Sequence, residues 1–245
     1  MKKLILSLIE KMGYEVSKAG ASRFASIDIE NDKDFERLMN QCRPYTMTSL
    51  QRLYALNQAV NYISKNNING DFVECGVWRG GSSMMSALTL LENKDTSRNL
   101  YLYDTFEGMS EPTEKDVSMV GDLAEHTWQD RDKCEADLND VQTNMKKTNY
   151  PFSKISFVEG KVEETIPKTL PSSIALLRLD TDWYESTYHE LVHLFPKLIS
   201  GGVLIIDDYG HWQGARKAVD QYFAEQKIPI LLNRIDYTGR IAIKP

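Results

Sequence analysis

Residues 71–83 of this chain, DFVECGVWRGGSS, pass from an apolar run through a glycine-rich turn into a second apolar segment, residues 84–91. That change of pattern predicts a buried strand, a tight turn and the start of a helix. The glycines of the turn carry no Cβ, which lets a ligand approach the backbone closely. We expect Ser82 or Ser83 to cap the helix. On its own, the pattern fits a connection without a ligand equally well.

The composition of the chain limits its location and its partners. Among 245 residues, 29 Lys and Arg stand against 35 Asp and Glu, and the net charge of -6 argues against nucleic acid as the partner. Cys42, Cys75 and Cys134 show no metal-binding spacing, so we interpret them as free thiols and expect a cytoplasmic protein. No run approaches the ~18 apolar residues of a membrane span, and none is expected.

The N-terminal part of the chain is expected to form a helical extension, residues 1–45, ahead of an α/β domain, residues 46–245. Polar residues 13–33 predict a loop. Apolar residues at helical spacing predict helices over residues 4–12, 34–42 and 50–63. Thr48 or Ser49 is placed to cap the last of these helices.

Beyond residue 70, strand-like and helix-like segments alternate, which is typical of a parallel sheet covered on both faces. The expected strands are residues 71–75, 99–103, 155–158, 174–179 and 203–206. The expected helices are residues 84–91, 124–147, 186–198 and 214–226. Residues 228–232 and 240–243 predict a closing antiparallel hairpin. The predicted fold class is therefore a doubly wound, mostly parallel α/β sheet with this hairpin at its C-terminal end.

Acidic residues stand where the predicted strands end. Ligands of open α/β sheets bind outside these carboxyl ends, so the residues there are functional candidates. They are Glu74 and Gly76, Asp104, Glu159 and Gly160, Asp180 and Asp182, and Asp207 and Asp208. So many carboxylates in one crevice repel one another unless a cation joins them.

Asp104 ends the second predicted strand, 28 residues after Gly76. A carboxylate there is placed to accept both hydroxyl hydrogens of a ribose, and with the glycine turn it indicates a nucleoside-bearing cofactor. The turn lacks the spacing G-x-G-x-x-G and has no P-loop lysine, so the pyrophosphate of a dinucleotide is not favoured. S-adenosylmethionine, with an adenosine and an amino-acid part, fits better. The alternative is that Asp104 only caps a turn.

Asp180, Asp207 and Asp208 form a second acidic group on two neighbouring strand ends. Oxygen ligands without cysteine or histidine suit Mg²⁺ or Mn²⁺. An ion held there would bind a substrate hydroxyl and lower its pKa, while a neighbouring carboxylate accepts the proton. Asp182 is an alternative to Asp180 as ligand, or acts as the base, and His211 is placed near a substrate. The alternative is that Asp207 and Asp208 only cap the following turn.

Several stretches resemble the macrocin O-methyltransferase (TylF-type) family, which consists of S-adenosylmethionine-dependent class I methyltransferases. These stretches are residues 46–49, 70–82, 103–109, 179–187 and 201–210. The resemblance implies a Rossmann-like fold, Mg²⁺ dependence and methylation of sugar hydroxyls on antibiotics and related glycosides. In this family the first forty or so residues help to form the substrate lid and the oligomer, so we expect a lid and a homo-oligomer.

The resemblance also implies roles for individual residues. Those that would contact the methyl donor are Glu74, Gly76, Ser82, Asp104 and Thr105. Those that would hold the metal are Asp180, Asp207 and Asp208, with Asp180 also a candidate base. We place the rest of the donor site around them, at Thr48, Cys75, Val77, Gly80, Ser83, Phe106, Gly160 and Asp180.

The function predicted from the sequence is O-methylation of a sugar, glycoside or related natural product, dependent on S-adenosylmethionine and Mg²⁺. Two alternatives use the same residues. One is a metal-dependent hydrolase, which would form product without a methyl donor. The other is a non-catalytic nucleoside-binding module, which would bind the donor without regard to Mg²⁺.

Overall fold

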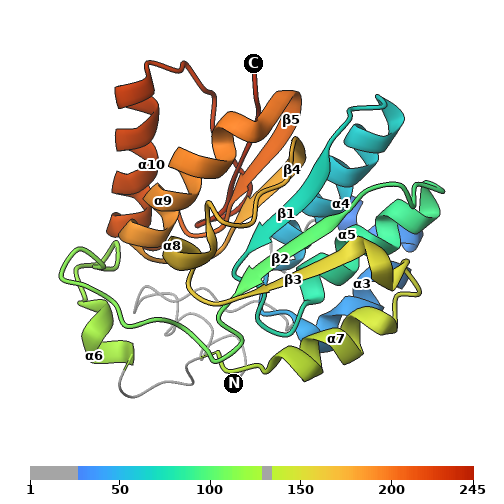
Figure 1. The fold of residues 1–245 in the computed structure, drawn as a ribbon, viewed down its shortest axis with the longest axis horizontal. Coiled ribbons are helices and arrows are strands. Elements are labelled where there is room, and N and C mark those ends of the chain that lie inside the picture. Colours follow the sequence, from blue (N-terminus) through green and yellow to red (C-terminus); the bar gives the residue numbers. More distant parts are fainter. Residues whose placement is uncertain (1–26, 129–133) are drawn as a thin grey trace, which may run out of the picture.

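The computed structural model describes residues 27–128 and 134–245, which form a seven-stranded sheet covered by helices (Figure 1). The strands are β1 (Asp71–Cys75), β2 (Leu100–Asp104), β3 (Ile155–Glu159), β4 (Ile174–Leu179), β5 (Leu198–Ile206), β6 (Asn233–Arg234) and β7 (Arg240–Ile243). Their order is β3-β2-β1-β4-β5-β7-β6. The first five are parallel, whereas β7 is antiparallel to both β5 and β6. The predicted fold class, including the closing hairpin, is confirmed.

Helices cover both faces of this sheet (Figure 1). One face carries α3 (Lys33–Cys42), α4 (Leu50–Lys65), α5 (Gly81–Glu92) and α7 (Leu138–Lys146). The other carries α8 (Val162–Thr165), α9 (Tyr184–Leu194) and α10 (Gln213–Gln226). The shorter elements are α2 (Ile27–Asn31), α6 (Ala124–Trp128), η1 (Arg43–Tyr45), η2 (Phe152–Lys154) and η3 (Phe195–Lys197). Over the described ranges, none of the helices has the length and apolarity needed to cross a bilayer.

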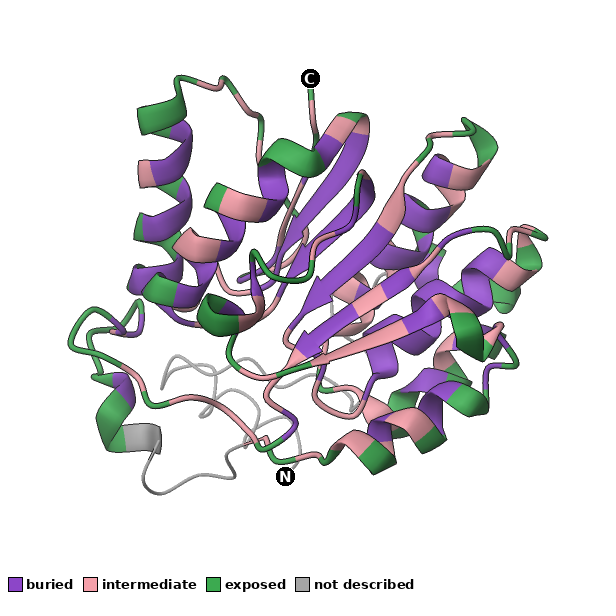
Figure 2. Ribbon diagram, viewed as in Figure 1, coloured by how far each residue is buried: buried purple, intermediate pink, exposed green. Residues whose placement is uncertain are grey.

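The sheet is held between two apolar clusters, one on each face. Strand β4 is buried along its whole length (Figure 2). Its successive side chains alternate between the faces, so Leu176 joins the cluster under α4 and α5 while Leu177 joins the cluster under α9 and α10. A strand buried on both faces is mostly apolar, and β4 is apolar apart from Arg178, which is why its bounds were readable from the sequence.

Some helix boundaries differ from those predicted. Helix α5 begins at Gly81 with Gly80 as its N-cap, rather than Ser82 or Ser83. Gly80 has φ +88°, a conformation that glycine adopts without strain. Of the two candidates for α4, Ser49 is the cap, and its hydroxyl accepts a hydrogen bond from the backbone N–H of Arg52.

Other differences follow from packing. The region predicted as one helix over residues 124–147 contains two, α6 and α7. The first hairpin strand is β6 rather than residues 228–232, because alternate side chains of that segment pack against the apolar cluster beside α10 instead of pairing. Strand β5 starts earlier than predicted, since α9 ends at Leu194, just before Pro196. Part of the predicted loop 13–33 is the helix α2. The helix predicted over residues 4–12 lies outside the described residues.

The strand ends lie side by side at the carboxyl edge of the sheet. Backbone hydrogen bonds run from Gly160 N to Asp104 O (3.0 Å), from Gly76 N to Tyr103 O (2.9 Å), from Asp180 N to Cys75 O (2.8 Å) and from Asp207 N to Leu179 O (2.9 Å). The candidate residues of five different strands therefore form one continuous row. The strand order reverses at β1 and β4 in the middle of this row, where sheets of this type bind ligands.

Candidate active site

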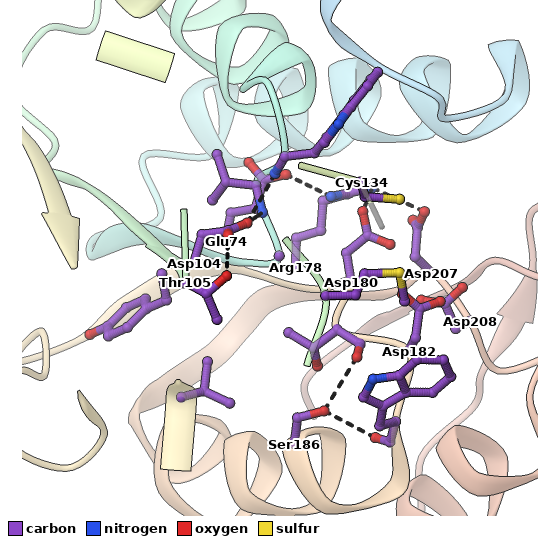
Figure 3. Close-up of a pocket in the computed structure, with 18 of the residues that line it drawn as sticks. Glu74, Asp104, Thr105, Cys134, Arg178, Asp180, Asp182, Ser186, Asp207 and Asp208 are labelled. Carbon is purple, nitrogen blue, oxygen red and sulfur yellow. Dashed lines mark hydrogen bonds and ion pairs between the residues drawn. The ribbon is translucent and has the colours of Figure 1, made fainter. Parts of the chain in front are cut away.

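A cavity of about 450 Å³ lies over the row of strand ends. This volume suits a small-molecule ligand. Its walls come from residues 45–48 before α4, the glycine turn after β1, the loop after β2, and the ends of β4 and β5. Figure 3 shows carboxylates from several of these segments around one space. The cavity is thus built from the loops that the sequence indicated.

Most of the predicted site residues line this cavity. They are Thr48, Glu74, Gly76, Val77, Ser82, Asp104, Thr105, Gly160, Asp180, Asp182, Asp207, Asp208 and His211. Cys75 is not among the lining residues, because it follows Glu74 on β1 and successive strand side chains point to opposite faces. It is buried on the α9 face, where burial and then the charge of Glu190 raise the pKa of its thiol.

Three further predicted donor residues stand behind the cavity wall rather than in it. Gly80 is the N-cap of α5. The Ser83 hydroxyl donates to Glu74 Oε2. Phe106 is buried, 6.4 Å from the ring of Phe157. These residues support the wall through packing and hydrogen bonds.

The carboxylate of Asp104 organises the donor end of the cavity. Its Oδ2 accepts hydrogen bonds from the backbone N–H of Val77 at 2.6 Å and of Trp78 at 3.0 Å. Its Oδ1 accepts from the backbone N–H of Phe106 at 2.8 Å. Asp104 therefore ties the glycine turn after β1 to the loop after β2.

The other end of the cavity holds a cluster of carboxylates. Asp182 has φ +65°, which is uncommon for a residue other than glycine and is found at strained functional positions. Its Oδ1 accepts a hydrogen bond of 2.9 Å from Trp212 Nε1, and its carboxyl is also hydrogen-bonded to that of Asp208. Burial, followed by the charge of Asp180, raises the pKa of Asp182 to about 7. Burial, with Asp182 and Asp207 nearby, also raises the pKa of Asp208. Both carboxyls therefore hold a proton more readily than an ordinary aspartate does.

Two arginines that the sequence did not assign to the site partly neutralise this cluster. Arg178 on β4 bonds to Glu74, Asp180 and Asp207. Arg52 on α4 pairs with Asp207 and, at 3.0 Å, with Asp236. Arg178 stood out in the sequence as the one charge in an apolar strand. Since buried charges require partners, its position was a signal that acids lay beside it.

The carboxylates suit a hard cation in their chemistry. In the described ranges, no three Asp, Glu, His or Cys side chains already converge as metal ligands. Two buried oxygens, Oδ1 of Asp207 and Oδ2 of Asp208, nevertheless have no hydrogen-bond partner among the described residues. An orphaned buried carboxylate oxygen is costly, and an oxygen-binding cation would satisfy it. The arginines compete for Asp180 and the other oxygen of Asp207, but leave these two oxygens available.

Aromatic side chains cover the acidic end. The rings of Trp183 and Trp212 meet edge to face at 5.1 Å, and the ring of His211 lies 4.7 Å from that of Trp212. Trp183 Nε1 donates to the carbonyl of Ser110 at 2.9 Å, which fixes the loop after β2 over the cavity. His211 also approaches Tyr237, with 6.0 Å between the rings. Trp183, Trp212 and His211 therefore line the cavity beside the acids.

A doubly wound sheet whose carboxyl edge carries a glycine turn, a carboxylate at the end of β2 and a second acidic group defines a Rossmann-like methyltransferase. Residues 8–242 match the macrocin-O-methyltransferase (TylF) family, and the chain belongs to that family. The resemblance drawn from the sequence is confirmed, and the chain is an O-methyltransferase.

Individual relatives of this chain are also named O-methyltransferases. The chain is 34% identical over 215 residues to the 8-demethyl-8-(2,3-dimethoxy-alpha-L-rhamnosyl)-tetracenomycin-C 4'-O-methyltransferase of Streptomyces olivaceus, covering 86% of this chain and 81% of the relative. It is 31% identical to the demethyldecarbamoylnovobiocin O-methyltransferase of Streptomyces niveus, over 80% of this chain and 74% of the relative. The solved structure of the O-methyltransferase NovP superposes with a TM-score of 0.73 at 30% identity, covering 82% of each chain.

Proposed function

We propose that this chain transfers the methyl group of S-adenosylmethionine to a hydroxyl of a sugar, glycoside or related natural product, and that the reaction requires Mg²⁺. One observation carries the proposal: a single cavity joins the turn at Gly76 and Asp104 to the acids Asp180, Asp207 and Asp208. The names of the relatives support the acceptor class, since one acts on a rhamnosyl-tetracenomycin and another is the mycinamicin III 3''-O-methyltransferase of Micromonospora griseorubida.

At the donor end, Asp104 is proposed to accept a hydrogen bond from a ribose hydroxyl with the one lone pair that its three backbone partners leave free. Glu74 and Thr48 would face the amino-acid part of the donor. Gly76 carries no side chain, which leaves the backbone of the turn open to the donor. The donor supplies an activated methyl group when bound, so the protein mainly has to position and deprotonate the acceptor.

At the acidic end, Asp180, Asp207 and Asp208 are proposed to hold Mg²⁺. When bound, the ion would supply charge that lowers the pKa of an acceptor hydroxyl and fixes its position. The orphaned oxygens of Asp207 and Asp208 support this assignment. Arg52 and Arg178 keep Asp207 in place by bonding to its second oxygen, Oδ2.

Asp182 is proposed as the general base. Its pKa of about 7 is close to the value at which a base is most effective near neutral pH. The indole N–H of Trp212 holds its carboxylate in one orientation. Asp182 would accept the acceptor proton as the acceptor oxygen takes the methyl group of bound S-adenosylmethionine. The electron pair of the broken carbon–sulfur bond would stay on sulfur, which gives S-adenosylhomocysteine.

The aromatic residues over the acidic end are proposed to bind the acceptor and exclude water. Trp183, Trp212 and His211 present rings to the cavity, and aromatic rings pack well on sugar rings. We also propose the division of the chain that the sequence predicts, with an extension over residues 1–45 and the methyltransferase domain over residues 46–245. Tyr45, at the boundary, lines the cavity.

Two measurements test this function. Calorimetric titration with S-adenosylhomocysteine, with and without Mg²⁺, tests the donor site. Incubation with S-adenosylmethionine and a panel of glycosides and nucleotide sugars, followed by mass spectrometry, should yield a methylated product that depends on Mg²⁺. Product that forms without a methyl donor would indicate a hydrolase instead. Donor binding without any transfer, and without response to Mg²⁺, would indicate a nucleoside-binding module.

A further inference from the structure

Arg178 is a buried cation that touches both ends of the cavity. It lies on β4 in register with Glu74 on β1, and its side chain is only 3% exposed. Its Nη1 donates to Glu74 Oε1 at 2.6 Å. Its Nη2 lies 2.8 Å from Oδ2 of Asp180 and 3.0 Å from Oδ2 of Asp207. Figure 3 shows Arg178 between Glu74 on one side and Asp180 on the other.

The partners of Arg178 belong to different parts of the proposed site. Nη2 also donates to the hydroxyl of Thr48 at 3.2 Å. Thr48 and Glu74 line the donor end, whereas Asp180 and Asp207 are the proposed metal ligands. One rigid guanidinium therefore joins the segment before α4, the end of β1 and the ends of β4 and β5.

The charges around Arg178 are unequal. In the described part of the chain, this single cation bonds to three carboxylates, all largely removed from water. Burial raises the pKa of Glu74, and the charge of Arg178 opposes that rise. Because an unpaired buried charge is costly, a ligand that engages some of these carboxylates changes what Arg178 offers to the others. The planar fork of arginine is suited to bonding in two directions, which the point charge of lysine is not.

We propose that Arg178 couples the two ends of the cavity, so that metal binding at Asp180 and Asp207 strengthens nucleoside binding at Glu74 and Thr48. This inference rests on the proposed function. An ion that engages Asp180 and Oδ1 of Asp207 competes with Arg178 for Asp180 but leaves the bond to Oδ2 of Asp207 in place. The guanidinium then bonds more strongly to Glu74 and Thr48, and both are held in place for the donor. A donor wall that is already ordered binds its ligand with a smaller loss of entropy. Arg178 is thus a positioning residue for both sites.

Linkage makes this coupling measurable in either direction, because each ligand must change the affinity of the other by the same factor. S-adenosylhomocysteine is the appropriate probe. Its amino-acid part is zwitterionic and its sulfur is neutral, so direct charge repulsion from Mg²⁺ is small. Calorimetry is used to measure its affinity for the full chain with and without saturating Mg²⁺, and the affinity for Mg²⁺ with and without the nucleoside.

The wild-type chain is expected to bind S-adenosylhomocysteine about fivefold more tightly, or better, when Mg²⁺ is saturating. In Arg178→Met the nucleoside and Mg²⁺ should each still bind. Each should change the affinity of the other by less than about twofold, which is below the usual range of coupling. Arg52→Met is the matched control. Arg52 is also bonded to Asp207, but its other ion-pair partner among the described residues is Asp236 rather than Glu74. Its loss should change the affinity for Mg²⁺ and leave the coupling in place.

Arg178→Lys is a second variant that tests the coupling even if Arg178→Met does not fold. It keeps the buried charge, and cooperative melting would show that it folds, yet its single ammonium should not bridge both ends, so the coupling should still fall. Absent or negative coupling in the wild-type chain would overturn the inference, as would coupling that persists in a folded Arg178 variant. Failure of the wild-type chain to bind the nucleoside at all would overturn the proposed function as well. Binding without coupling would overturn this inference alone.

Discussion

The α-carbon of Gly76 faces the backbone carbonyl of Asp180, and a Cβ built on Gly76 would lie 2.0 Å from that oxygen. The same glycine has φ +82°. The turn that is proposed to receive the methyl donor is therefore in direct backbone contact with the strand end that carries the acidic group. A Cβ at position 76 would collide with this backbone, so no residue except glycine fits there.

Replacement of Gly76 should lower the free energy of unfolding by more than the strain of its positive φ alone would. Gly76→Ala is expected to destabilise the chain by about 3 kcal/mol or more, from left-handed strain plus overpacking. Gly121→Ala is the matched control, because Gly121 has φ +98° but a Cβ added there would meet no described atom within 4 Å, and it should cost about 1–2 kcal/mol. Denaturant unfolding measures both. Equal losses would contradict the role of the contact with Asp180.

Removal of the proposed base should affect the chemical step and leave donor binding intact. Asp182→Asn keeps an oxygen for the indole N–H of Trp212 but is not able to accept the acceptor proton. The turnover rate should fall by about 10²–10⁴-fold, while affinity for S-adenosylhomocysteine changes little. Glu111→Gln, an acid-to-amide change at an exposed residue of the loop after β2, should leave turnover unaffected. Wild-type turnover by Asp182→Asn would exclude Asp182 as the base.

Stability should depend on pH through Asp182. Its folded-state pKa of about 7 lies above its ordinary value of 3.8, so its contribution to stability is complete below pH 3.8 and is lost as the pH rises through about 7. Without Mg²⁺, Tm is therefore expected to fall as the pH rises through this window, and the free energy of unfolding should fall by up to about 1.4 kcal/mol per pH unit for one proton. Calorimetric melts at several pH values measure it, and Asp182→Asn should flatten the slope. A flat wild-type profile would show that the pKa of Asp182 is not raised in the folded chain.

Mg²⁺ binding should release a proton. Asp208 is proposed to ligate the ion, and its raised pKa means that it holds a proton more readily than an ordinary aspartate does, whereas a ligating carboxylate must be deprotonated. Titrations in buffers with different ionisation enthalpies should reveal the release of about one proton per ion near neutral pH, and affinity should rise with pH. Asp208→Asn should lose most of the affinity. Binding enthalpies that are independent of the buffer would contradict the assignment of Asp208.

The hydrogen bonds that Asp104 accepts at the carboxyl ends of the strands can be compared with those that Asp71 accepts at the opposite ends of the strands. Asp104→Asn leaves an amide N–H facing a backbone N–H, so the turn loses a partner at a cost of about 1–3 kcal/mol, and nucleoside affinity should fall about tenfold or more. Asp71 likewise joins β1 to the segment before β2, through a 2.9 Å bond from Asn99 N to its Oδ1. Calorimetry and melting should show that Asp71→Asn loses stability but keeps nucleoside affinity. Equal affinity losses in both variants would indicate a general effect of sheet stability.

Much of the fold could be predicted from local patterns in the sequence. Strand β4 was predicted with its observed bounds because a strand buried on both faces is mostly apolar, and only Arg178 interrupts the apolar run. The donor turn was readable because the glycines at 76, 80 and 81 break an apolar run. The first hairpin strand was misplaced, because whether residues 228–232 pair or pack depends on α10, which the local pattern does not contain. Cys75 could have been excluded from the cavity lining, since Glu74 and Cys75 must point to opposite faces of β1.

The order of residues was enough to establish that this chain forms a doubly wound sheet with acids at the carboxyl end of its strands, because strand burial and strand ends leave local signatures. How those acids are neutralised became visible only in the folded chain. Arg178 and Arg52 reach them from β4 and α4, and Asp182 meets Asp208 from the end of a different strand. Electrostatic partnership depends on distance in space and on burial, and neither is present in the order of residues along the chain.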